Sequence, residues 1–183
     1  CPLTRGNIRD GLLPINKGII VKGYLDNFKD GNSKPNITNS IRLDLKKSLQ
    51  YVKDQELTFI ETGSGTENKV NSKIALMNAV ENNKPDPIIA RKDIGVSYHI
   101  AVTYDDHYQK ITHVVRGYDL YESTHLHVLI QKLSNWRTPK YHHHPVLNNE
   151  YGDKLSKRGL DTTIRSLRSN GLTAQQVLDM ATL

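Results

Sequence analysis

Short apolar runs in the first 70 residues are separated by glycine and proline at intervals too short for long helices. These runs predict strands at residues 19–21, 40–43 and 57–60, and the second shows the apolar-polar alternation of a half-buried strand. Residues 63–65, Gly-Ser-Gly, predict a plain connection, because no lysine-bearing phosphate loop follows them. Only short elements are therefore expected here.

Residues 71–83 carry apolar side chains at helical spacing. The apolar residues of this segment include Ile74, Met77, Ala79 and Val80, and Pro85 follows shortly afterwards. A helix that ends before this proline is predicted, since the residue before a proline avoids the helical region.

The following stretch alternates strand and helix signals. Strands are predicted at residues 88–90, 96–103 and 111–116, with a turn at Asp105 and Asp106. The continuous apolar runs at 100–102 and 114–115 suit strands covered on both faces, as in a parallel sheet. If 96–103 is a strand, then Tyr98 and His99 point to opposite faces, so at most one faces a ligand directly.

Three helices are predicted in the C-terminal part. Leu126, Leu129, Ile130 and Leu133 fall at helical spacing, with Thr124 as the expected cap. A second helix is expected to begin at a cap in position 161 and to end near position 171. Residues 173–176, Thr-Ala-Gln-Gln, form a capping-box pattern that opens the last helix. The order of elements indicates an α/β fold.

Composition narrows the class of protein. The 183 residues suffice for one domain or one and a half, and 37% of them are hydrophobic. No apolar stretch is long enough to span a bilayer, so no membrane association is predicted. The net charge of +6 favours a polyanionic partner such as RNA. A single cysteine excludes an internal disulfide and fits a reducing, cytoplasmic location.

Residues 154–158, Lys-Leu-Ser-Lys-Arg, are the first candidate for chemistry, and we call them the lysine loop. Lys154, Ser156 and Lys157 place two mobile cations and a hydroxyl on one short segment, which suits a polyphosphate. Taken alone, such a segment is more often a solvated basic turn, because lysine and serine are common surface residues.

Arg116 is the second candidate. It lies at the predicted C-terminal end of a strand, directly before Gly117, and ligands of open parallel sheets gather beyond these strand ends. A guanidinium holds a carboxylate through two parallel hydrogen bonds. The alternative is a structural ion pair with Asp119.

Three segments in a fixed order resemble a known family. Residues 112–120 read Thr-His-Val-Val-Arg-Gly-Tyr-Asp-Leu, residues 138–145 read Thr-Pro-Lys-Tyr-His-His-His-Pro, and the lysine loop follows. This order resembles class I aminoacyl-tRNA synthetases of the glutamyl type, from position 86 to the C-terminus and more weakly back to position 1. The short glutamyl-queuosine tRNA(Asp) synthetase group is most similar, on residues 90–93, residues 97–102, the Asp105-Asp106 pair and the early end after the lysine loop.

The resemblance implies a fold and a division of the chain. Residues 86–183 would form the second half of a Rossmann-like catalytic domain with a parallel sheet, the lysine loop and C-terminal helices. Residues 1–85 would form an inserted, mixed α+β connective region. The family's H-x-G-H nucleotide signature does not occur in the sequence, so a fragment that is inactive by itself is expected.

The resemblance also implies an activity. Glutamate would attack ATP, accompanied by Mg²⁺, to give an adenylate, and the glutamyl group would pass to queuosine in the anticodon of tRNA(Asp). Arg116 and Tyr98 match positions that bind glutamate, although Tyr98 also suits a core position. Lys157 matches the ATP-binding lysine of the catalytic loop, with Lys154 and Ser156 in support. A conventional glutamyl-tRNA synthetase and a non-catalytic RNA-binding relative are the alternatives.

The family's zinc-binding segment is the last point of comparison. Residues 1–5, Cys-Pro-Leu-Thr-Arg, resemble its C-x-C-T-R start, with Leu3 at the position of the second cysteine. One thiolate does not build a tetrahedral site, so we predict that zinc is absent. Nothing in the sequence points to an oligomeric state.

Overall fold

The computed structural model describes residues 21–22, 41–91, 96–146 and 163–181. Two sheets organise this part of the chain. Strands β1 (Val21–Lys22), β2 (Ile41–Leu43) and β5 (Ile88–Ala90) form a small antiparallel sheet in the order β1-β2-β5. The larger sheet has the order β4-β3-β7-β6, with β3 at Thr58–Glu61, β4 at Asn68–Asn71, β6 at His113–Gly117 and β7 at Lys140–His144.

The larger sheet contains a parallel core. β7 pairs in parallel with both β3 and β6, whereas β4 returns antiparallel to β3 as a hairpin. The predicted α/β class with a parallel sheet is thereby confirmed. The strands come from both sides of position 85, and the division into regions 1–85 and 86–183 stays a prediction.

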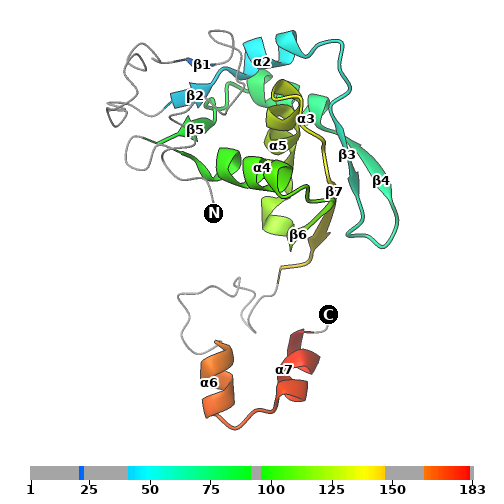
Figure 1. The fold of residues 1–183 in the computed structure, drawn as a ribbon, viewed down its shortest axis with the longest axis vertical. Coiled ribbons are helices and arrows are strands. Elements are labelled where there is room, and N and C mark those ends of the chain that lie inside the picture. Colours follow the sequence, from blue (N-terminus) through cyan, green and yellow to red (C-terminus); the bar gives the residue numbers. More distant parts are fainter. Residues whose placement is uncertain (1–20, 23–40, 92–95, 147–162, 182–183) are drawn as a thin grey trace.

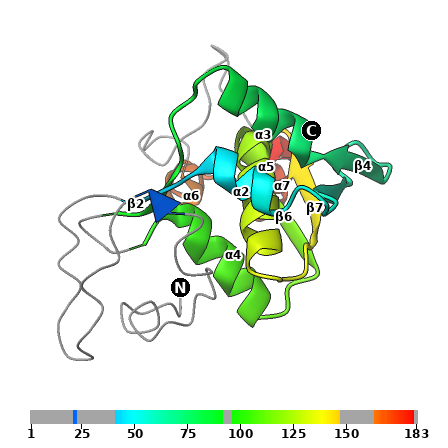
Figure 2. The same ribbon diagram turned by 90° about the horizontal axis from the view of Figure 1, so that it is seen from above.

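Four helices lie on one side of the larger sheet and pack around the central helix α5 (Figures 1 and 2). They are α2 (Leu45–Tyr51), α3 (Ser72–Glu81), α4 (Tyr98–Tyr108) and α5 (Tyr121–Leu133), and α5 contacts the other three. The core between helices and strands includes Val52, Leu57, Val128 and Leu129, each nearly inaccessible. Val115 on the other face exposes 67% of its surface, so the expectation of two covered faces is wrong there.

Side-chain caps explain where several helices begin. The carboxylate of Asp44 accepts from Lys47 N at 3.1 Å to open α2, and Asn71 accepts from Lys73 N at 2.9 Å to open α3. α3 confirms the helix predicted over residues 71–83. Helix α2 and strands β4 and β7 were not predicted from the sequence.

The strand predicted over residues 96–103 is wrong. Ser97 takes extended backbone angles, and its hydroxyl faces Ile100 N at 3.5 Å, so that the residues after it form α4. Ile100 and Thr103 are the buried residues of this helix. Asp105 and Asp106 lie inside α4 and do not turn the chain.

Two further cap predictions are corrected. Thr124 lies within α5, which follows directly on a 3₁₀ turn, η1 (Tyr118–Leu120), and therefore begins earlier than expected. α6 (Ile164–Ser169) begins after Thr163, whose hydroxyl accepts from Ser166 N at 3.1 Å, and not at the cap expected in position 161.

The predicted capping box of the last helix is confirmed. α7 (Ala174–Ala181) begins after Thr173, whose N–H donates to Gln176 Oε1 at 2.9 Å, while Gln176 N donates back to Thr173 Oγ1 at 3.3 Å. Gly171, with φ of 85°, ends the preceding α6 segment.

Candidate active site

Polar side chains gather where the three parallel strands end. Glu61 closes β3, His143 lies near the end of β7, and Arg116 lies near the end of β6. Arg116 and His143 are directly paired in the register, so their side chains share one face of the sheet. The carboxyl edge of a parallel sheet is the usual place for a ligand.

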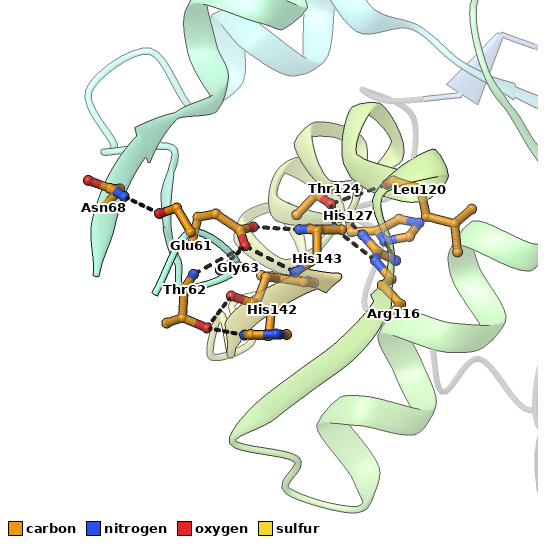
Figure 3. Close-up of polar contacts among 12 residues, drawn as sticks. Glu61, Thr62, Gly63, Asn68, Arg116, Leu120, Thr124, His127, His142 and His143 are labelled. Atoms are coloured by element: carbon orange, nitrogen blue, oxygen red, sulfur yellow. Dashed lines mark hydrogen bonds and ion pairs between the residues drawn. The ribbon is translucent and has the colours of Figure 1, made fainter. Parts of the chain in front are cut away.

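The guanidinium of Arg116 is held from three sides (Figure 3). Its Nε donates to His143 Nε2 at 3.1 Å, its Nη1 lies 3.1 Å from His127 Nδ1, and its Nη2 donates to Thr124 Oγ1. The Arg116 Cζ also lies 5.1 Å from the centre of the Tyr141 ring, at cation–π distance. We call Arg116, His143, His127, Thr124 and Glu61 the Arg116 cluster.

Glu61 anchors the cluster to the loop after β3 (Figure 3). Its Oε1 accepts from Gly63 N at 2.7 Å, from His143 N at 3.0 Å and from Thr62 N at 3.1 Å, while its Oε2 lies 2.5 Å from His143 Nδ1. Gly63 is needed because a Cβ there would lie 2.3 Å from the carbonyl oxygen of His143. Both carboxylate oxygens are therefore held by the β3–β7 junction.

Arginine has only N–H donors, so every atom that is hydrogen-bonded to Arg116 must act as an acceptor. His143 must present a lone pair at Nε2 to Arg116, so its proton lies on Nδ1, where it donates to Glu61. Thr124 Oγ1 lies 3.0 Å from the same Nε2, but its hydroxyl can donate to the Leu120 carbonyl at 3.3 Å. The imidazole lone pair is thereby kept for Arg116.

A second imidazole chain runs from Arg116 towards α4. His127 accepts at Nδ1 from Arg116, so its proton lies on Nε2, which is 3.0 Å from His99 Nδ1. His99 then carries its own proton on Nε2. The ring of Tyr98 lies 5.8 Å from the His99 ring and 6.0 Å from the His127 ring.

The pKa values agree with neutral imidazoles. Burial lowers the pKa of His127 to about 2, and the positive charge of Arg116 acts in the same direction. Burial also lowers the pKa of His143, although Glu61 opposes this, and burial together with Arg116 lowers the pKa of His99. Burial raises the pKa of Glu61, but the hydrogen bonds from His143 and Gly63 outweigh it, so this pKa lies below its ordinary value.

Tyr141 and Asp106 border the cluster. Burial raises the pKa of Tyr141 to about 12, although its hydroxyl accepts from Gln131 Nε2 at 3.0 Å. Burial raises the pKa of Asp106, against the attraction of Arg116. Tyr141 is therefore an uncharged ring on which the guanidinium of Arg116 packs.

Two of the predicted site residues lie near each other. Arg116 lies at the strand end where the sequence placed it. Tyr98 is the first residue of α4, 49% exposed, beside the His127 that contacts Arg116. Their roles in glutamate binding stay predictions. The lysine loop, with Lys154, Ser156 and Lys157, lies outside the described residues. Its position relative to Arg116 therefore stays a prediction.

The sequence did not point to Glu61, His127 or His143 as members of a site. Glu61 and His143 are 82 positions apart, and the strand β7 that joins them was itself not predicted. Thr124 was expected as a cap, although its spacing of three from His127 places both on one face of a helix.

The described residues contain neither a metal-binding group nor a membrane-spanning helix. No group of three or more histidine, cysteine or acidic side chains within the described residues is arranged to hold a metal ion. Cys1 lies outside these residues, so the absence of zinc stays a prediction. None of the described helices is both long and apolar enough to cross a membrane.

Comparisons with known proteins point to one family. Residues 37–183 match the family described as tRNA synthetases class I (E and Q), catalytic domain. A glutamyl-Q tRNA(Asp) synthetase of Rhodobacter capsulatus is 38% identical over 92 residues, which are 50% of this chain and 33% of that protein. A glutamate–tRNA ligase of Borreliella burgdorferi is 38% identical over 99 residues, 54% of this chain and 20% of that protein.

A crystal structure of a glutamate tRNA ligase from Elizabethkingia meningosepticum, in complex with its amino acid, is also similar. It aligns with a TM-score of 0.45 and 27% identity, over 68% of this chain and 22% of that one. The chain thus spans between a fifth and a third of the length of these relatives.

Proposed function

Because the chain belongs to the class I tRNA synthetases for E and Q, we propose that it carries residues of an enzyme that activates glutamate with ATP and transfers it to tRNA. The observation that carries the proposal is the position and surroundings of Arg116. Its guanidinium lies at the carboxyl edge of three parallel strands, and its three hydrogen bonds go to neutral groups.

Such a guanidinium suits an anionic ligand. The three hydrogen bonds use three of its five N–H donors, and two donors have no hydrogen bond to any described residue. No carboxylate of the described residues forms an ion pair with Arg116, and a half-buried cation of this kind gains most from a ligand that brings a carboxylate. In the proposed enzyme this ligand is a carboxylate of glutamate, with Tyr98 beside it.

The proposed reaction needs no protein nucleophile. A carboxylate oxygen of glutamate bonds to the α-phosphorus of ATP, and the bond from this phosphorus to the β-phosphate oxygen breaks, which releases pyrophosphate. Lys157, with Lys154 and Ser156, would stabilise the charge that grows on the phosphates, and Mg²⁺ would enter with ATP. Arg116 contributes by orientation of the attacking group.

The proposed acceptor is queuosine in the anticodon of tRNA(Asp). The glutamyl group would pass from the adenylate to a hydroxyl of the cyclopentene ring, with release of AMP. The similarity to the Rhodobacter capsulatus protein supports this acceptor. The glutamate–tRNA ligase of Borreliella burgdorferi is equally identical, which supports the 3′ end of a glutamate tRNA as the alternative.

Pyrophosphate exchange tests both. The full-length gene product is incubated with glutamate, ATP and labelled pyrophosphate, with and without tRNA. Exchange in the absence of tRNA is expected for the queuosine-modifying enzyme, whereas exchange that requires tRNA favours the conventional ligase. No exchange under either condition would contradict both activities, and aspartate in place of glutamate serves as the control substrate.

A further inference from the structure

We propose that Glu61 is a positioning residue that acts through His143 to hold Arg116 as a donor towards the substrate carboxylate. This rests on the proposed role of Arg116 in glutamate binding. Glu61 lies on β3 and Arg116 on β6, with β7 between them, so His143 connects the outer two strands of the parallel core.

The first step is the rigidity of the Glu61 carboxylate. Oε1 accepts three backbone N–H groups, from Thr62, Gly63 and His143, and only Oε2 is left to face the imidazole. A carboxylate with one oxygen held in this way does not rotate, and its second oxygen presents a fixed acceptor at His143 Nδ1.

The second step is the rigidity of the His143 ring. His143 exposes 3% of its surface, and its ring stacks on that of Tyr141 with centres 5.9 Å apart and planes 8° from parallel. The edge of the ring touches Glu61 on one side and Arg116 on the other. Because the carboxylate accepts at Nδ1, the ring donates from Nδ1 and accepts at Nε2.

The third step concerns the effect on Arg116. With Nε bound to His143 and Nη2 bound to Thr124, one side of the guanidinium fork is fixed. The orientation of the remaining N–H donors follows, because the guanidinium is planar. If His143 carried its proton on Nε2, this N–H and the Nε–H of Arg116 would point at each other, and Arg116 Nε would lose its acceptor.

Glu61→Gln is the informative change because it keeps the shape of the side chain and replaces the acceptor that faces His143 Nδ1 by a donor. The amide oxygen can still accept the three backbone N–H groups, while the amide nitrogen now donates towards His143 Nδ1. The imidazole is then expected to move its proton to Nε2. A carboxylate that served only to order the loop would show no such reversal.

The test combines two measurements on the full-length gene product. Nitrogen-15 NMR of the histidines assigns the tautomer of His143, and pyrophosphate exchange gives separate KM values for glutamate and ATP. In the Gln variant we expect the Nε2–H tautomer and a KM for glutamate raised about ten- to hundredfold, as for the loss of a hydrogen bond to a charged group. The KM for ATP should stay within about twofold.

Two variants serve as controls. Glu67→Gln removes an exposed carboxylate of the same hairpin, which pairs with Lys140, and should leave the tautomer and both KM values unchanged. Glu61→Asp keeps an acceptor and should retain the Nδ1–H tautomer, with a KM for glutamate between those of the wild type and the Gln variant. This second variant tests the relay even if the Gln variant does not fold.

The outcomes are distinguishable. An Nε2–H tautomer in the wild type, or an inverted tautomer in the Gln variant with an unchanged KM for glutamate, would overturn the relay. An Nδ1–H tautomer in a wild-type protein that shows no glutamate-dependent exchange would overturn the proposed function instead.

Discussion

The stability of the protein should fall steeply as the pH drops below 6.5, and His127 should account for much of the fall. This side chain exposes 1% of its surface and faces Arg116. Burial and the positive charge of Arg116 together lower its pKa to about 2, from an ordinary value of 6.5. Between these two values the unfolded chain binds a proton that the folded chain does not. Stability is therefore complete above pH 6.5 and is lost as the pH falls from 6.5 towards 2.

The magnitude follows from the shift. Each pH unit below 6.5 costs about 1.4 kcal/mol for one histidine that stays neutral when folded, so at pH 5 His127 should cost about 2 kcal/mol relative to pH 7.5. The pKa values of His99, His125 and His143 are also lowered, mainly by burial, and act in the same direction. Glu61 adds its own loss only below its ordinary pKa of 4.5, whereas the raised pKa of Asp106 acts in the opposite direction to the histidines. The share of His127 is therefore taken from the difference between the wild type and a variant without this histidine.

The assay is urea unfolding at pH 7.5 and pH 5 for the wild type and for His127→Asn. The amide oxygen of Asn can accept from Arg116 as Nδ1 does, and the side chain does not titrate. The difference in unfolding free energy between the two pH values should shrink by about 2 kcal/mol in the variant. An equal difference in both proteins would show that His127 does not cause the loss of stability. The exposed His113, replaced by Asn, provides the matched control.

Three further predictions concern the loop after β3 and the two candidate ligand sites. Gly63→Ala should lower the unfolding free energy by about 2 kcal/mol, since the new Cβ would lie 2.3 Å from the carbonyl oxygen of His143. Ser64→Ala, at an exposed position, should leave the unfolding free energy unchanged. Equal denaturation curves for the wild type and the Gly63 variant would disprove the close approach. Arg116→Lys should raise the KM for glutamate far more than that for ATP in pyrophosphate exchange, because lysine does not form the paired hydrogen bonds; equal losses would contradict the assignment. Lys157→Ala should depress adenylate formation by at least about tenfold, and an unchanged exchange rate would remove this residue from the site.

Elements with a strong local signal were predictable from the sequence. The helix over residues 71–83 has an Asn cap and ends before a proline, although its buried side is formed by Ser72 and Leu76 while Ile74 and Met77 are exposed. The last helix has a Thr and a Gln that cap each other. β3, β5 and β6 are apolar runs bounded by polar residues. The caps of the two helices lie within a few positions of the groups they bind, and each strand carries its own apolar run, so sequence patterns detect these elements. The pairing partners of the strands are distant in the sequence and were not predictable in this way.

α4 shows where local patterns mislead. The segment Ile100-Ala101-Val102 looks like a buried strand, because a short apolar run has the same appearance in either structure. Ser97 and the burial of Ile100 and Thr103, three positions apart, decide for the helix. Burial on one face is a tertiary property, and the run itself does not reveal it.

The Arg116 cluster shows the same limit for the site. The sequence indicated Arg116 by its place before Gly117, and the structure confirms that it lies near the end of a parallel strand. Its partners come from β7 and α5, and Glu61 comes from a strand that lies 55 positions before it. Only the pairing of β3 with β7 brings the carboxylate to the imidazole, and no spacing in the sequence encodes this pairing.

The most direct test is a crystal structure of the full-length gene product with glutamate and a non-hydrolysable ATP analogue. We expect a glutamate carboxylate within about 3.2 Å of the guanidinium nitrogens of Arg116, with Lys157 on the phosphates of the nucleotide. Glutamate bound elsewhere, with Arg116 facing only His143, His127 and Thr124, would contradict this expectation.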